Sequence, residues 1–315
     1  MIRTDICERI GLEYPLFQGG MAWISEAKLA AAVSNAGGLG IISAMNAPGD
    51  YLKQQIALCR TLTDKPFGVN VMLMSPYTKE VAKVILDERV DVVTTGAGLP
   101  GSYMKEWVPA GIKVIPVVPS VAIAKRVARD GATAVIAEGG ESGGHVGELT
   151  TMSLVPQVVD AVDIPVLAAG GIADGRGIAA AIMLGAQGVQ CGTRFLSAFE
   201  CQVHENYKKK ILAARDIETV VTGKRLGHPV RSLRTPFARS FAEMEMDNAV
   251  TNEALEAFGA GSLRKAAIDG DIESGSFMAG QIAAMVTKEQ SAKDIIEEMF
   301  AQAQVCLMEA TRWIK

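Results

Sequence analysis

The stretch IPVLAAGGIADGRGIAAAIMLGAQGVQCGTR, residues 164–194, decides the fold. It holds two short apolar runs, 165–169 and 188–192, on either side of a segment, 175–184, with the 3.6-residue apolar spacing of a helix. A strand, a helix and a second strand in this order predict two parallel strands joined by a right-handed crossover. Runs such as IPVLAAG (164–170) and IPVVP (115–119) are continuously apolar rather than alternating, as expected when both faces of a sheet are covered.

The same unit recurs along the N-terminal two thirds of the chain. Eight runs are expected to be strands, at 15–18, 39–43, 67–72, 90–95, 113–118, 133–137, 165–169 and 188–192. Helical spacing lies between them, for example over 26–34, 49–62, 77–87, 121–129 and 154–162. Parallel sheets of this kind are either open and doubly wound or closed into a barrel. Eight units in about 200 residues favour an α/β protein with a (β/α)8 TIM barrel, built from residues 1–200.

The rest of the chain, residues 201–315, does not continue this rhythm. Residues 200–240 carry nine Lys or Arg against four Asp or Glu, a local excess of five positive charges. Residues 241–315 are rich in Ala, Glu and Met, which favours helices, with a closing helix near Ser291–Ile314. We therefore expect a basic connecting segment and a helical cap or subdomain that packs on the barrel.

Composition narrows the class of protein. The chain has 315 residues, 49% apolar and 21% charged, as in globular proteins, and its net charge of −4 gives no reason to expect a nucleic acid. Five scattered cysteines without CxxC spacing favour reduced thiols over disulfides, and no Cys/His cluster or HExxH predicts a metal site. We find neither a signal peptide nor a membrane-spanning apolar stretch, so we expect a cytoplasmic protein that binds no membrane.

Glycine-rich turns follow the last two predicted strands. Gly170 and Gly171 end the seventh strand, and Gly192 and Thr193 end the eighth, where a phosphate site recurs in this fold. Glycines let backbone N–H groups approach an oxyanion, and a helix that begins near Asp174 adds the positive end of its dipole. The alternative is that these glycines only relieve tight turns.

The sixth strand is followed by EGGESGGHVG, residues 138–147, with five glycines in ten residues. Ordering such a loop costs much chain entropy, so we expect a bound ligand to order it. His145 is the only one of the three histidines in the barrel region, and an imidazole there suits proton transfer near neutral pH. The alternative is a histidine of the surface or of the packing.

Six motifs occur together: QGGMA (18–22), NAGGLG (35–40), FGVN (67–70), AEGGESGGH (137–145), AAGGI (168–172) and CGTRF (191–195). Over residues 1 to about 240 the chain resembles the FMN-dependent barrel family that holds nitronate monooxygenases (2-nitropropane dioxygenase-like enzymes) and the flavin-dependent enoyl-[acyl-carrier-protein] reductase II. The form EGGESGGH and the continuation MAW of the first motif resemble the reductase branch most closely.

The resemblance implies FMN as cofactor and NADH or NADPH as co-substrate, and a monovalent cation is a further possibility. It places the FMN phosphate on Gly171, Gly192 and Thr193, with Ala169 and Gly170 alongside. The flavin ring would be held by Gly19, Gly20, Met21, Ala22 and the amide of Asn70, with Glu138, Ser142 and Gly143 at its other edge. His145 would be the catalytic residue, beside the substrate.

The activity that the resemblance implies is reduction of trans-2-enoyl-acyl-carrier-protein thioesters, the last step of the fatty acid elongation cycle. The alternatives are a nitronate monooxygenase and, from another class, a phosphate-metabolite isomerase or lyase, or a flavin-storing module. The partner would be an acidic acyl carrier protein or an acyl-CoA, for which the basic segment 200–240 is a candidate docking site, unless it is only a solvated face. The family resemblance also predicts a homodimer.

Overall fold

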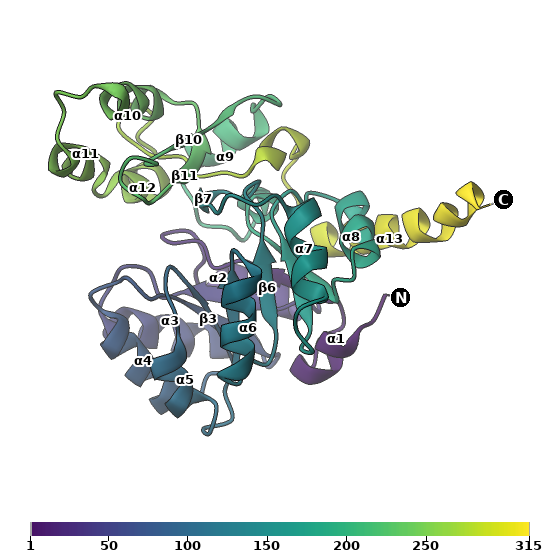
Figure 1. The fold of residues 1–315 in the computed structure, drawn as a ribbon. Coiled ribbons are helices and arrows are strands. Elements are labelled where there is room, and N and C mark those ends of the chain that lie inside the picture. Colours follow the sequence, from purple (N-terminus) through teal and green to yellow (C-terminus); the bar gives the residue numbers. More distant parts are fainter. Residues whose placement is uncertain (1, 315) are drawn as a thin grey trace.

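The computed structural model describes residues 2–314, and its centre is a barrel of eight parallel strands (Figure 1). They are β1 (Leu16–Gln18), β2 (Gly40–Ser43), β3 (Phe67–Met72), β4 (Val92–Gly96), β5 (Lys113–Val118), β6 (Val135–Glu138), β8 (Val166–Ala169) and β9 (Gly188–Cys191). The order is β1-β9-β8-β6-β5-β4-β3-β2, and a parallel bridge between Phe17 and Leu39 joins the two edges. The predicted (β/α)8 barrel is confirmed, and each of the eight predicted runs is a strand.

Helices surround this sheet. They are α1 (Asp5–Ile10), α2 (Ala27–Asn35), α3 (Gly49–Leu62), α4 (Thr78–Asp87), α5 (Gly101–Trp107), α6 (Val121–Arg129), α7 (Thr151–Val159) and α8 (Gly175–Met183). The bounds of α3 and α6 are those predicted from the sequence. Helix α7 begins three residues before the predicted 154–162, because the Glu141 carboxylate accepts the N–H of Thr151 and caps the helix there.

The inside of the barrel is a packed apolar core. The short helix α1 contributes Ile6, Cys7 and Ile10 to it, and these side chains pack with Phe17 and Leu39 from the strands. All five are at most 4% exposed. Helix α1 therefore closes the end of the barrel at which the strands begin, and the opposite end is left for a site.

The closing helix predicted near 291–314 is present as α13 (Ala292–Glu309). It packs against α8 and α2, and the Gln302 side chain accepts the N–H of Gly175 at 2.8 Å. The Tyr14 and Phe300 rings lie 4.9 Å apart at the same junction. The chain therefore leaves the barrel after β9 and returns to it with α13. A division into independent domains at residue 200 stays a prediction.

The excursion, residues 201–280, is called the lid below; Figure 1 shows it to one side of the barrel, next to β7. Its elements are α9 (Glu205–Leu212), β10 (Thr219–Thr222), β11 (Val230–Leu233), α10 (Pro236–Met246), α11 (Asn252–Gly259) and α12 (Ser262–Arg264). The two lid strands form an antiparallel sheet with β7 (Gly144–His145), in the order β10-β11-β7. The sequence did not predict these strands, since each is short and β7 lies in a distant loop.

The lid has a small apolar cluster of its own. Phe237, Phe241 and Leu255 are buried together, and Phe258 stacks on Phe237 with the ring centroids 5.1 Å apart.

Among residues 2–314, none of the helices combines the length and the apolar character needed to cross a membrane.

The close contact between α2 and β2 gives a test of the fold. A Cβ at Gly40 would lie 1.7 Å from the backbone oxygen of Ala30, whereas a Cβ at Gly96, also in a strand, would meet nothing within 4 Å. We expect Gly40→Ala to lower the free energy of unfolding by about 3 kcal/mol or more, or to prevent folding, and Gly96→Ala to change it by about 0.5–1 kcal/mol. Urea denaturation of the two variants measures this; equal losses would contradict the packing.

Candidate active site

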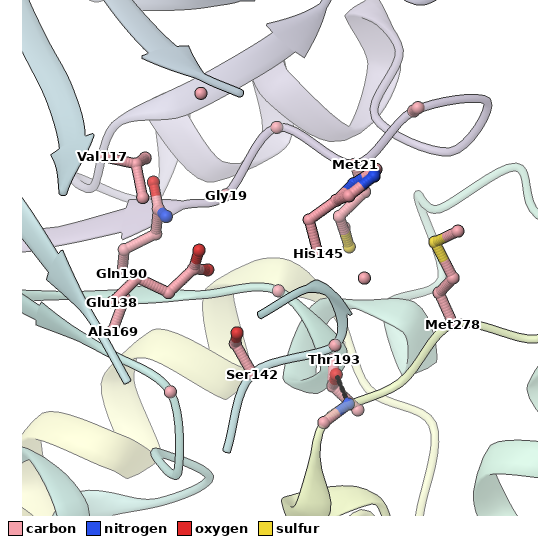
Figure 2. A pocket seen from close by; sticks show the side chains of 18 of the residues that line it. Gly19, Met21, Val117, Glu138, Ser142, His145, Ala169, Gln190, Thr193 and Met278 are labelled. Carbon is pink, nitrogen blue, oxygen red and sulfur yellow. Dashed lines mark hydrogen bonds between the residues drawn. The ribbon is translucent and has the colours of Figure 1, made fainter. Parts of the chain in front are cut away.

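A pocket of about 600 Å³ lies at the C-terminal ends of the barrel strands, between the strand-end loops and the lid (Figure 2). Its size is that of a site for a cofactor or small molecule, about 300–1,000 Å³. All fourteen site residues singled out in the sequence line it: Gly19, Gly20, Met21, Ala22, Asn70, Glu138, Ser142, Gly143, His145, Ala169, Gly170, Gly171, Gly192 and Thr193. The structure thus brings them together, and their individual roles stay proposals.

The floor of the pocket is polar, because the last inward-facing position of several strands carries a polar side chain. On β6 the core residue Ile136 is followed two positions later by Glu138, as the alternation of a strand requires. Asn70 of β3 donates from Nδ2 to Thr94 Oγ1 at 3.0 Å. A Cβ at Gly20 would lie 2.2 Å from the Cβ of Asn70, so only glycine fits beside this amide.

Gln190 was missed in the sequence. It belongs to β9 and lines the pocket, and Figure 2 shows its side chain on the same side of the pocket as Glu138 and Ser142, with Met278 on the other. The sequence did contain a signal for Gln190. It is a polar residue two positions after the inward-facing Gly188, and it lies toward the C-terminal end of its strand, as Asn70 and Glu138 do on theirs.

Burial raises the pKa of the Glu138 carboxyl to about 7, against a smaller lowering by the nearby Ser142 hydroxyl. The charged form is disfavoured because the pocket floor removes the carboxylate from water. Glu138 is therefore protonated in part near neutral pH, when it is able to donate a hydrogen bond as well as accept one.

The turns after β8 and β9 present unused backbone donors. Gly170 and Gly171 have φ of +90° and +73°, which glycine adopts without strain. Within the part of the chain that the structure describes, the N–H groups of Gly171 and Ile172 donate to no protein acceptor. Gly192 precedes a 3-10 turn (Thr193–Ser197) that no side chain caps. These donors suit an anion.

The loop 139–149 is held by protein contacts. The Thr151 hydroxyl donates to the Glu141 carboxylate at 2.9 Å, and a Cβ at Gly143 would lie 2.6 Å from the backbone of Ala279. The Gly280 N–H donates to Thr193 Oγ1 at 2.9 Å, which joins the lid side to the turn after β9. The buried Ser142 hydroxyl lies near enough to the Glu138 carboxyl to lower its pKa, but it makes no hydrogen bond of ordinary geometry to the described residues and is open to a ligand.

His145 lies in β7 at the edge of the pocket. One side of His145 is exposed to solvent. Partial desolvation by the surrounding loop lowers the pKa of its imidazole below the ordinary value, and the positive charge that His228 can carry lowers it further. The neutral imidazole, with one N–H donor and one acceptor nitrogen, is therefore favoured near pH 7.

The lid supplies a wall that sequence reasoning missed. Met278 and Leu263 line the pocket from the lid, and the Arg264 guanidinium lies 5.7 Å from the ring centroid of Trp23 on the first barrel loop. Trp23 has φ of +62°, an uncommon conformation for a bulky residue. Nothing local in the sequence links positions more than 200 residues apart.

Among residues 2–314 no three His, Cys, Asp or Glu side chains gather as a metal site would need.

The sequence and the fold of this chain are similar to those of known proteins. The model of the family described as nitronate monooxygenase matches residues 3–85 and 76–302. The solved structure of FabK from Thermotoga maritima is 50% identical, covers 100% of both chains and superposes with a TM-score of 0.97.

Two curated relatives are named for activities that differ from each other. A (3aS,4S,5R,7aS)-5-hydroxy-7a-methyl-1-oxo-octahydro-1H-indene-4-carboxyl-CoA dehydrogenase of Rhodococcus jostii is 41% identical over 76% of this chain and 68% of its own length. A probable nitronate monooxygenase of Staphylococcus saprophyticus is 33% identical over 96% of this chain and 98% of its own. The chain belongs to the nitronate monooxygenase family of oxidoreductases, as the motifs indicated.

The raised pKa of Glu138 predicts a pH-dependent stability. Its folded pKa, about 7, lies above the ordinary 4.5, so the folded protein loses stability as pH rises from about 4.5 to 7. Since one pKa unit corresponds to about 1.4 kcal/mol, we expect Glu138→Gln to stabilise the flavin-free protein by about 1–3 kcal/mol at pH 8. At pH 5 the gain should be much smaller. Thermal denaturation at both pH values measures it.

The control for removing one negative charge is Glu148→Gln, in the exposed part of the following loop. A gain for Glu138→Gln that is the same at pH 5 and pH 8 would show that the carboxyl is not held neutral by its surroundings.

Proposed function

We propose that this protein is an FMN-dependent reductase of trans-2-enoyl thioesters, carried by acyl carrier protein or by CoA, with NADH or NADPH as reductant. The likeness to FabK over the full length, at 50% identity, is the observation that carries the proposal. The CoA dehydrogenase named above adds a relative that acts on a CoA thioester.

The residues present fit FMN. The unpaired N–H groups of Gly171 and Ile172 and the uncapped turn at Gly192 would hold the phosphate. Asn70 and Glu138 offer the polar groups that a flavin ring needs along the pocket floor. The buried hydroxyl of Ser142 makes no hydrogen bond of ordinary geometry to the described residues, as expected of a group whose partner is a ligand.

FMN held by these residues would supply hydride-transfer chemistry between NAD(P)H and the β-carbon of the enoyl thioester. As the hydride arrives, negative charge develops on the thioester oxygen, and a proton is needed at the α-carbon. The neutral His145 imidazole holds a proton on one ring nitrogen at the edge of the pocket, so it would donate a hydrogen bond to that oxygen. To supply the α-proton, the ring would first take up a proton from solvent, and the imidazolium would return to neutral imidazole as it gives that proton to the α-carbon.

The partners belong to this proposal as well. Among the cations of segment 200–240, Arg225 and Lys208 donate to backbone carbonyls of the protein itself, at Asp247 and Ala198. Exposed cations such as Lys224 and Arg239 are left to meet an acidic carrier protein or the phosphates of a CoA. We also propose a homodimer.

A second candidate is oxidation of alkyl nitronates with oxygen. The description of the matching family model and the Staphylococcus saprophyticus relative favour it. The same pocket and His145 would serve, because a nitronate carries a negative charge near which an N–H donor is useful.

The proposal is tested with purified, FMN-loaded protein and crotonyl-CoA. We expect it to consume NADH or NADPH at a rate that depends on the thioester. His145→Ala should keep the yellow colour and the flavin content but lose turnover by about 10²–10³-fold, the usual cost of one such donor. The decrease in absorbance at 340 nm measures the turnover, and the visible absorption spectrum measures the flavin content.

His228→Ala, which removes the neighbouring imidazole, is the matched control and should retain most of the turnover. Rapid oxygen uptake with a nitronate and no use of NAD(P)H would favour the second candidate instead. A colourless protein that binds no added FMN would contradict both.

The phosphate site is tested by Gly171→Asp against Gly171→Asn. Both side chains have the same size, and both tolerate the left-handed conformation of Gly171 (φ +73°). The carboxylate would repel a phosphate dianion, so we expect Asp to weaken FMN binding at least about tenfold more than Asn. Fluorescence titration of the flavin-free variants measures the difference; equal FMN affinities would place the phosphate elsewhere.

A further inference from the structure

His145 is carried by the lid sheet, although its loop comes from the barrel. Strand β7 has only two residues, and within the described chain its one sheet neighbour is β11, with His145 opposite Val230 and Gly144 opposite Arg231. The Val146 N–H donates to the Pro229 carbonyl at 3.0 Å and continues this pairing. The backbone position of the imidazole therefore depends on the lid.

Arg231 fastens the same strand to the start of the loop. Its Nε and Nη2 both donate to the carbonyl oxygen of Gly140, at 3.1 and 2.9 Å, and its Nη1 donates to Thr219 Oγ1 at 3.1 Å. The planar guanidinium offers these donors in a fixed fork, which an ammonium group does not. One side chain of the lid thus holds the backbone five residues before His145.

The barrel holds the neighbouring residue. The Glu141 carboxylate accepts from the N–H and the hydroxyl of Thr151, and the Glu141 carbonyl accepts the Gln281 N–H at 2.9 Å. Positions 140 and 141 are thus fixed from two sides, one by the lid and one by the barrel. The glycines at 143 and 144 would otherwise give the chain that leads to His145 wide freedom.

Arg231 is not among the residues that line the pocket. We propose that Arg231 is a positioning residue, which holds the His145 imidazole at the pocket through Gly140 and the β7–β11 pairing and so couples the lid to catalysis. The inference deepens the proposed function, because it rests on the role given to His145 there.

The experiment compares Arg231→Met, which has the length but no donors, with Arg231→Lys, which keeps the charge. Arg234→Met is the matched control, since Arg234 follows β11 and donates to the Thr219 carbonyl within the lid. In FMN-loaded protein we expect Arg231→Met to lower kcat about 10- to 100-fold, as misplacement of a catalytic group does. Arg231→Lys should lose less, and Arg234→Met should keep the native kcat at saturating crotonyl-CoA, where a loss of docking charge would alter only KM. FMN affinity should stay unchanged in all three.

A double-mutant cycle separates positioning from a general structural effect. In the His145→Ala background, Arg231→Met should cause little further loss of kcat, because the group that it positions is gone. The same fold-loss with and without His145 would overturn the inference.

A second readout does not need the reaction. The chain has three histidines, so the imidazole proton NMR signals of His145, His204 and His228 are assigned from the three alanine variants. We expect Arg231→Met to shift the His145 signal and to raise its pKa toward the ordinary value, as the loosened ring gains water. The His204 signal, from the N-cap of α9, should stay in place and show that the fold is intact.

The two readouts keep the inference distinct from the proposed function. If crotonyl-CoA is not reduced but Arg231→Met shifts the His145 signal while Arg234→Met does not, the function fails and the positioning stands. An unchanged His145 signal in Arg231→Met, with His204 also unchanged, overturns the positioning whatever the enzyme reduces.

Discussion

The site depends on one constraint, the common direction of the eight parallel strands. Because every strand runs in the same direction, all their carboxyl ends meet at one rim of the barrel. Helix α1 fills the other end with Ile6 and Ile10, so the rim is the open end. Residues as far apart in the sequence as Gly19 and Thr193 become walls of one pocket without any local signal that links them.

This constraint also explains what the sequence could predict. Once the strands were recognised, their ends located Asn70, Glu138 and the glycine turns, since a parallel barrel leaves no choice about where those residues lie. Gln190 was open to the same reasoning. The β7–β11 pairing was not, because two residues of a glycine-rich loop have no strand pattern and their partner lies about 85 residues away.

The lid is the part for which composition alone left the role of the charges open. Its positive charges indicated a basic surface, yet Arg231 is used within the fold to hold the Gly140 carbonyl, and Arg225 to cap the carbonyls of Asp247 and Val250. A count of charges does not distinguish a guanidinium that binds a partner from one that binds its own backbone. Burial and hydrogen-bond partners make that distinction, and only the folded chain contains them.

Two titratable groups of the pocket, Glu138 and His145, have pKa values that are shifted toward their neutral forms. Burial raises the pKa of Glu138, and partial desolvation lowers that of His145. The Glu141 carboxylate, which accepts from Thr151, also lines the pocket, and among the described residues no Lys or Arg lines it. Arg194, 8% exposed, lies next to Thr193 but donates to Ser197 and Gln290 rather than lining the pocket. A negatively charged ligand in this pocket is therefore met by backbone N–H groups rather than by a Lys or Arg side chain. Such a site favours a phosphorylated cofactor, and a reaction in which charge appears only as the substrate is transformed.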